Sequence, residues 1–317
     1  MSNSGFKLKG INIGGKYKLL FAFLVLIIII SFLTPNFMSW RNIINVFRQS
    51  SIVGIMAIGS TFVIIGGGFD ISVGSLMALT AAMAVGLQSS MHWSLSIIVV
   101  IGVGVVFGIL NGILSAKIHI PAIIATLGTM TIIRGFVYMY TGGYPLYVDS
   151  QGFSFIGNGY IGPIPFPIIL FIGLVILGQF VLTKTKFGRY ACAIGGNKEA
   201  ARLSGVKVDY YLIMTFVVGG MAASISGIVY ASRLLSVTPL AGQGYELDAI
   251  ASAVIGGTSV SGGEGSVFRT LIGALLLTMI TNAFNLMGIN LYVQYVFKGI
   301  VILAAVGFDS YSKAKLD

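Results

Sequence analysis

The sequence has one cysteine, Cys192, and two histidines, His92 and His119. One thiol excludes an internal disulfide framework and a cysteine-based metal cluster, and two histidines exclude a histidine-rich metal site. Charge is also scarce, at 9% of 317 residues, against roughly 25% in an ordinary soluble domain. So few charges cannot cover the surface of a soluble globule of this size. The composition therefore predicts an integral membrane protein and excludes a soluble enzyme, a fibrous chain and a disordered chain.

In place of charge the chain has 56% hydrophobic residues and 43 glycines, a composition typical of membrane helices. A helix that crosses the bilayer needs about 20 mostly apolar residues, with every backbone group bonded internally. Ten segments fit, with the first and eighth the shortest: 19–34, 51–68, 71–90, 93–116, 122–140, 163–183, 210–232, 247–263, 267–287 and 290–308. The predicted fold class is all-α, a polytopic transmembrane helix bundle of about ten spans.

Lysine and arginine orient this bundle, because they concentrate in cytoplasmic loops. With a cytoplasmic N-terminus, ten spans place fourteen of the 19 Lys and Arg inside and only Arg41, Arg48 and Arg233 outside. The net charge of +10 thus reflects membrane topology rather than affinity for nucleic acid. Both termini are predicted to be cytoplasmic. The predicted divisions are an N-terminal tail at 1–18, a transmembrane permease domain at 19–308 and a C-terminal tail at 309–317.

The segment between the first two spans, 37–50, is amphipathic. It places Trp40, Arg41 and Arg48 among apolar residues. This pattern favours a separate helix that lies at the membrane interface, with Trp40 at the level of the lipid headgroups.

The cytoplasmic loop 184–209 carries six basic and two acidic residues. Within it, Asn197 and Gly205 are suited to cap the start and end of a short helix. Glu199 near the start and Arg202 near the end match the helix dipole. Such a helix on the cytoplasmic face indicates a docking element for another subunit. The alternative is a solvated connector.

Ionisable residues within spans are costly, so they tend to mark polar pathways or to pair internally. Asp70 follows three glycines at a break between two spans, where irregular backbone needs cover from protein or a water-filled cavity. Glu246 and Asp248 open another apolar run, and Arg134 and Lys298 lie inside spans. Either these residues pair and cap broken helices, or some of them line a polar route.

Neutral polar side chains also lie within the spans, at Asn111, Asn282, Asn285, Thr126, Thr129, Thr281 and Gln294. They could bind a neutral polar solute or join neighbouring helices by hydrogen bonds. The scarcity of charge argues against proton relays and charged substrates. The residues predicted to line a substrate path are Asp70, Asn111, Thr126, Arg134, Asn282 and Asn285.

No cofactor, metal site or catalytic residue is predicted. The segment 10–16, "GINIGGK", matches the start of a phosphate-binding loop, but Tyr17 stands where a Ser or Thr would hold magnesium. ATP and Mg²⁺ are therefore expected on a partner subunit. An intramembrane hydrolase is disfavoured, because Asp70 has no matching aspartate in another span and both histidines fall at span ends.

Two glycine-rich segments, 57–75 and 249–266, resemble each other. Internal repeats are common in transporters. The predicted topology places both glycine clusters near the cytoplasmic side, whereas an inverted repeat would place them on opposite sides. An inverted repeat is therefore not favoured.

Four segments carry a resemblance to a known family: "GGFDISVGSLMALT" at 67–80, "IPAIIATLGTMTIIRGFVYMYTGG" at 120–143, "FGRYACAIGGNKEAARLSGVKV" at 187–208 and "GYELDAIASAVIGGTSVSGGEGS" at 244–266. From about Pro35 to Gly307 the chain resembles the permeases of bacterial ribose-type sugar importers, which are ATP-binding-cassette (ABC) transporters. The resemblance implies a non-catalytic subunit of the bacterial inner membrane that translocates a monosaccharide by alternating access.

The resemblance also implies partners. These are ATP-binding subunits, a periplasmic or lipid-anchored sugar-binding protein, and a second permease subunit in a homodimer or heterodimer. It implies that the segment from Gly195 to Gly205 couples the chain to the ATPase through Gly195, Gly196, Asn197, Lys198, Glu199, Ala200, Ala201, Arg202, Leu203 and Gly205. An ABC permease for nucleosides, autoinducer-2 or branched-chain amino acids is the alternative, followed by a stand-alone secondary carrier.

Overall fold

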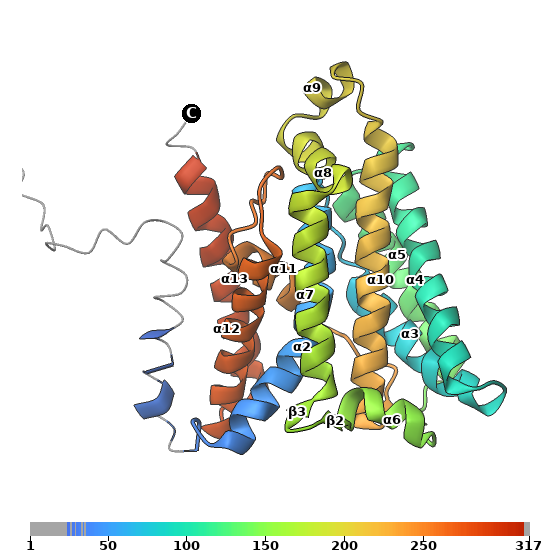
Figure 1. Cartoon of the computed structure of the whole chain (residues 1–317), viewed down its shortest axis with the longest axis vertical. Coiled ribbons are helices and arrows are strands. Elements are labelled where there is room, and N and C mark those ends of the chain that lie inside the picture. Colours follow the sequence, from blue (N-terminus) through green and yellow to red (C-terminus); the bar gives the residue numbers. More distant parts are fainter. Residues whose placement is uncertain (1–23, 26, 29, 33, 35, 314–317) are drawn as a thin grey trace, which may run out of the picture.

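The computed structural model describes residues 24–313, except 26, 29, 33 and 35. Its helices run mostly along one axis (Figure 1). The predicted tail at 1–18, with its glycine-rich segment, lies outside the described residues. So do part of the first predicted span and residues 314–317.

Six helices in the described part of the chain are long and apolar enough to cross a membrane. They are α2 (Trp40–Ile65), α4 (Trp93–Ala116), α5 (Ala122–Thr141), α7 (Phe166–Lys184), α10 (Val208–Leu234) and α12 (Val267–Leu286). The other helices are α3 (Val73–Gly86), η1 (Leu87–Ser89), α6 (Gln151–Asn158), α8 (Lys186–Gly196), α9 (Lys198–Leu203), α11 (Tyr245–Ile255) and α13 (Leu291–Lys313). Residues 24, 25, 27, 28 and 30–32 are also helical.

Short strands tie the loops at the end of the bundle that lies opposite α9 (Figure 1). Strand β1 (Leu146–Tyr147) pairs antiparallel with β4 (Ser236–Val237), and β2 (Tyr160–Ile161) pairs antiparallel with β3 (Ile164–Pro165). The first pair joins the segment after α5 to the segment after α10. These loops therefore form one braced face.

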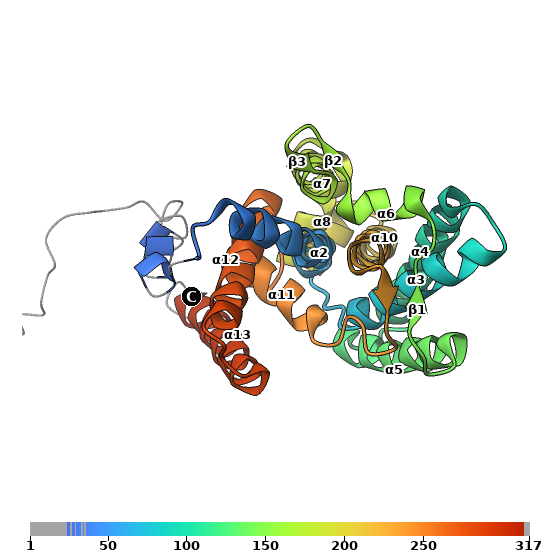
Figure 2. The same cartoon turned by 90° about the horizontal axis from the view of Figure 1, so that it is seen from below.

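Helices α2 and α10 lie at the centre, with α11, α12 and α13 on one side and α3, α4 and α5 on the other (Figure 2). Most of α2 and α10 is buried, whereas only 28% of the apolar span of each of α4, α5 and α7 is buried. Glycines allow close approach at the centre. Gly104 of α4 lies against Gly220 of α10, and a Cβ on Gly108 would come within 2.6 Å of the Phe216 carbonyl oxygen. Small residues serve this purpose between membrane helices.

The interfacial helix predicted at 37–50 is not separate from the next predicted span, because Trp40–Ile65 forms the single helix α2. The reason lies in the polar face of the segment. The Asn42 and Asn282 side-chain amides exchange two hydrogen bonds of 2.9 Å, which join α2 to α12. Asn42 is thus buried between helices, whereas Trp40 and Arg41 of the same segment are exposed.

The eighth predicted span, 247–263, also differs from the structure, because the helix in this segment, α11, has only 11 residues. At 1.5 Å per residue such a helix is about 16 Å long and cannot cross a hydrocarbon core of about 30 Å. The loop before α11 is fixed by Arg134, whose Nη1 donates to the carbonyl oxygens of Pro239 and Ala241 at 2.7 and 2.9 Å. It brings Glu246 against Gly74 at the start of α3. Two short helices therefore begin side by side within the bundle.

The similarity of 57–75 to 249–266 corresponds to a shared helix ending. Helices α2 and α11 both end in two glycines, and the second has a positive φ, +85° at Gly67 and +80° at Gly257. In each case the next residue donates its N–H to the carbonyl five positions back, at 2.9 and 3.0 Å. This is the Schellman motif, which favours glycine at the left-handed position.

Candidate functional site

The segment predicted to dock another subunit lies at the end of the bundle away from the strands (Figure 1). The Asn197 side chain accepts a hydrogen bond from the Ala200 N–H at 2.9 Å, as predicted for the cap of α9. At the other end the cap residue is Ser204, and Gly205 follows with φ +80°. The sequence did not predict α8, the amphipathic helix that precedes α9.

One face of α9 is packed and the others are open. Ala201 is buried against Ile194 and Val208. Leu203, by contrast, is 87% exposed. The Arg202 Nη1 atom lies 2.9 Å from the Glu199 Oε1 atom, in an ion pair with both side chains exposed. A rigidly anchored short helix that presents a leucine and an ion pair to solvent is suited to contact another protein.

Beneath α9, Gly195 lies at a three-way junction. The Gly263 N–H donates to the Ile65 carbonyl oxygen at 2.9 Å. A Cβ on Gly195 would overlap that same oxygen and come within 2.5 Å of the Gly263 nitrogen. Helix α8 therefore touches the end of α2 and the loop between α11 and α12 at one point.

This junction predicts different effects on stability when each of two neighbouring glycines is replaced by alanine. A Cβ on Gly196 meets nothing within 4 Å among the described residues, unlike a Cβ on Gly195. Gly195→Ala is expected to cost about 1–3 kcal/mol by overpacking, whereas Gly196→Ala is expected to be neutral or slightly stabilising. Thermal unfolding of both purified variants measures the difference. Equal melting temperatures would contradict the close junction.

Three of the residues predicted to line a path meet at the break between α2 and α3. Asp70 Oδ1 accepts hydrogen bonds from the Ser72 N–H and hydroxyl at 2.9 and 2.6 Å. Asn111 Nδ2 donates to the Ser72 hydroxyl at 2.8 Å and to Asp70 Oδ2 at 3.4 Å. Thr126 accepts from the Ile71 N–H at 3.2 Å. All of these side chains are buried, so the cluster fixes the broken backbone.

The other three predicted path residues make separate contacts, although Asn282 and Asn285 are only one turn apart on α12. Arg134 holds the loop before α11, and Asn282 pairs with Asn42. Asn285 lines the wall of a polar cavity. The sequence therefore predicted one residue of this cavity as part of its path.

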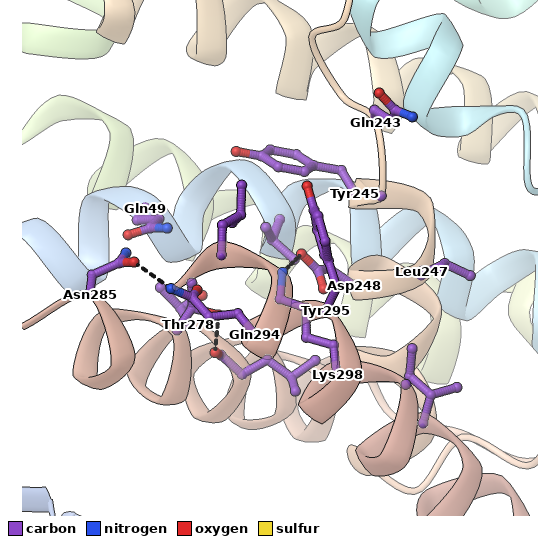
Figure 3. A pocket seen from close by; sticks show the side chains of 17 residues that line it. Gln49, Gln243, Tyr245, Leu247, Asp248, Thr278, Asn285, Gln294, Tyr295 and Lys298 are labelled. Carbon is purple, nitrogen blue, oxygen red and sulfur yellow. Dashed lines mark hydrogen bonds and ion pairs between the residues drawn. The ribbon is translucent and has the colours of Figure 1, made fainter. Parts of the chain in front are cut away.

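The cavity lies between α2, α11, α12 and α13 and has a volume of about 490 Å³. Figure 3 shows the amides of Gln49, Asn285 and Gln294 on one side of it and Gln243 beyond Tyr245 on the other. Its polar and aromatic lining consists of Gln49, Gln243, Tyr245, Asp248, Thr278, Thr281, Asn285, Gln294, Tyr295 and Lys298.

An ion pair between α13 and α11 lies in the wall of this cavity. Lys298 Nζ of α13 donates to Asp248 Oδ2 of α11 at 2.8 Å, with the side chains 25% and 10% exposed. Beside it, Gln294 Nε2 donates to Asn285 Oδ1 at 2.9 Å and to the Ile289 carbonyl oxygen at 3.0 Å. The sequence identified Asp248 and Lys298 as unusual, but nothing in their spacing shows that they meet.

The cavity presents hydrogen-bonding groups whose charges cancel. In the described part of the chain, no group of three His, Cys, Asp or Glu lies close enough to hold a metal ion. Cys192 lies in α8, away from the cavity, and burial raises the pKa of its thiol. Such a wall can hold a polar solute by several weak contacts. Together with the membrane-length helices and the exposed α9, this wall is typical of a membrane transport subunit.

Residues 42–306 match the family model of branched-chain amino acid transport system / permease component, and the chain belongs to this family. It is 43% identical over 299 residues to the ribose import permease protein RbsC of Haemophilus influenzae, covering 93% of each chain. It is 43% identical over 293 residues to RbsC of Bacillus subtilis, covering 92% of this chain and 91% of the relative. It is 38% identical over 316 residues to the L-arabinose transport system permease protein AraH of Escherichia coli, covering 96% and 93%. No solved structure matches the chain.

These matches confirm the resemblance carried by the four sequence motifs. The chain is a permease of the ABC-importer type and a multi-pass protein of the bacterial cell membrane. Permeases of this kind are non-catalytic subunits.

Proposed function

We propose that this chain moves a monosaccharide, ribose or a related sugar, across the membrane by alternating access. The observation that carries the proposal is the junction at Gly195. It links the exposed α9 to the end of α2 and to the loop between α11 and α12. Because α2, α11 and α12 line the polar cavity, a push on α9 is transmitted directly to the cavity walls.

Ten spans with cytoplasmic termini accompany this function. The helical residues between 24 and 32 and the helices α2, α3, α4, α5, α7, α10, α12 and α13 supply nine of them. The short helix α11 supplies the tenth together with the loop before it. The described end of α13 lies at the same end of the bundle as α9 (Figure 1), which supports an even number of crossings between α9 and the end of α13. In this arrangement 1–18 and 309–317 are cytoplasmic tails around the transmembrane domain 19–308.

The loop 184–209 then meets the ATP-binding subunits, which hold ATP and Mg²⁺. We assign contact with them to Lys198, Glu199 and Arg202, and to the exposed leucine beside them. Ala200, Ala201 and the flanking Gly195, Gly196, Asn197 and Gly205 shape the segment. A second permease subunit and a sugar-binding protein complete the importer, the latter at the braced face opposite α9.

Within the substrate path we place Asn285 in contact with the solute, since it lines the cavity. Asp70, Asn111, Thr126, Arg134 and Asn282 support the path from behind. They hold the broken helices and the α2–α12 contact in place.

A branched-chain amino acid is the second candidate solute. The family model carries that description, and a zwitterion could engage the Asp248–Lys298 pair. The relatives quoted above are named for ribose and L-arabinose, which favours a sugar.

Uptake of radiolabelled solutes tests the proposal, in cells that carry the whole importer with this chain intact or deleted. The panel contains D-ribose, L-arabinose, D-xylose, a nucleoside, autoinducer-2 and leucine. Deletion is expected to abolish uptake of one sugar. Loss of leucine uptake alone would contradict the sugar assignment, and uptake by this chain without an ATP-binding subunit would contradict the importer.

A further inference from the structure

The ion pair between Asp248 and Lys298 is an expensive feature for a membrane helix bundle. A charged side chain within the hydrocarbon costs several kcal/mol unless it is paired or hydrated. Even a well-formed buried pair is often no more stabilising than apolar residues of similar volume. Stability alone therefore does not explain why α11 and α13 meet through charges.

Both partners keep hydrogen-bonding capacity on the cavity side. An ammonium has three donors and a carboxylate has about four lone-pair sites, and the pair uses one donor and one site at 2.8 Å. The charges cancel, so the cavity attracts neither cations nor anions strongly. It nevertheless offers a charged donor next to a charged acceptor.

The surrounding side chains suit a hydroxylated solute. The bonds from Gln294 to Asn285 and to the Ile289 carbonyl hold that amide in one orientation. Tyr295, which is 53% exposed, and the half-buried Tyr245 provide aromatic rings beside the ion pair (Figure 3). Aromatic faces can cover the C–H side of a sugar ring, while amides and charges bind its hydroxyls.

We propose that this cavity binds a neutral polyol through Asp248 and Lys298 while their ion pair stays closed. One hydroxyl donates to the carboxylate and a neighbouring hydroxyl accepts from the ammonium. This inference rests on the proposed function and assigns its solute contacts. Because no ion pair has to open, the solute can leave as readily as it enters, which transport requires.

An amino-acid zwitterion would use the same residues differently. Its ammonium would bind Asp248 and its carboxylate would bind Lys298, and the existing bond between the two would have to break. Removal of both charges would then abolish recognition of the zwitterion. A polyol would lose only the strength that charge adds to its hydrogen bonds.

The test uses the complete importer in proteoliposomes, with the double variant D248N/K298Q. This variant removes both charges of the pair together. Neither side chain is therefore left as an unpaired buried charge that would destabilise the fold. We expect the amount of D-ribose, L-arabinose or D-xylose moved per ATP hydrolysed to fall by about tenfold. A neutral amide bonds a hydroxyl more weakly than the charge that it replaces, and a combined loss of about 1.4 kcal/mol over the two bonds is a factor of ten.

The matched control is T61V/T270V. These hydroxyls form another buried polar contact of 2.8 Å between α2 and α12, outside the cavity lining, and valine preserves their shape. The control is expected to keep the wild-type ratio of sugar to ATP. If D248N/K298Q does not assemble, Tyr295→Ala replaces it, since this side chain is mostly exposed and its loss is expected to lower the ratio severalfold.

The outcomes separate this inference from the proposed function. If the wild-type importer moves no sugar, the proposed function fails. If it moves sugar and D248N/K298Q moves it equally well per ATP, the polyol site is wrong. If D248N/K298Q abolishes leucine transport and leaves sugar transport intact, the cavity is a zwitterion site.

Discussion

Replacement of both Glu199 and Arg202 by alanine is expected to lower sugar uptake to the level of a deletion strain. The two side chains form an exposed ion pair on α9, and such pairs contribute about 0.3–0.5 kcal/mol to a helix. The fold therefore hardly depends on them. Under the proposed function, their loss removes charged contacts to the ATP-binding subunit, so we expect that ATP hydrolysis no longer moves the permease. Uptake of the identified sugar, normalised to the chain content of isolated membranes, measures the effect.

Lys117→Ala is a suitable control, because this residue is exposed and follows the end of α4. It is expected to leave uptake at the wild-type level. Leu203→Glu extends the test, since it places a charge where an 87% exposed leucine would enter an apolar socket on the partner. If E199A/R202A and Leu203→Glu both transport normally, the solvated-connector interpretation of 184–209 is correct.

Helix α9 could be predicted because its signals are local. The Asn197 cap and the glycine after the helix act within a few residues, and the structure reproduces both. The same holds for most spans, whose apolar character follows from composition. The local sequence determines where a helix begins and ends far more than it determines which elements pack against that helix.

The failures arose where a distant partner decides the structure. Residues 37–50 were predicted to form a helix apart from the next span, because the sequence cannot show that Asn42 meets Asn282, which lies 240 positions away. The segment 247–263 was predicted to span because its glycines are counted as membrane-compatible, whereas Gly256 and Gly257 end α11. Hydropathy does not distinguish a crossing helix from a short helix with a buried loop.

The sequence could predict that the candidate site contains paired ionisable residues within the membrane, but not where in the fold the site lies. Membrane depth alone identified Asp248 and Lys298 as residues that need a partner. Their contact depends on how α11 and α13 pack, and neither was placed in the predicted path. Asp70 was placed there because its break resembled a cavity lining. The structure instead shows its carboxylate bonded to Ser72 and Asn111.

Asp70→Ala is expected to lower the membrane content of the chain severalfold. The Ser72 N–H, the Ser72 hydroxyl and Asn111 Nδ2 all lose an acceptor inside a buried cluster. Each buried donor left unsatisfied costs about 1–3 kcal/mol, a large share of a typical unfolding free energy of about 5–15 kcal/mol. Immunoblots of isolated membranes and thermal unfolding in detergent measure this loss.

The exchange D70N/N111D separates a structural role of Asp70 from contact with the solute. The exchanged pair again contains one carboxylate and one amide, so donors and acceptors match across the break. Recovery is expected to be partial, because Asn111 Oδ1 is buried and has no partner among the described residues, and the new carboxylate would keep that unpaired oxygen. If Asp70 acts by holding α2 and α3, uptake recovers in proportion to membrane content. If content recovers and uptake does not, the position of the carboxylate itself matters to the solute, and Asp70 belongs in the substrate path.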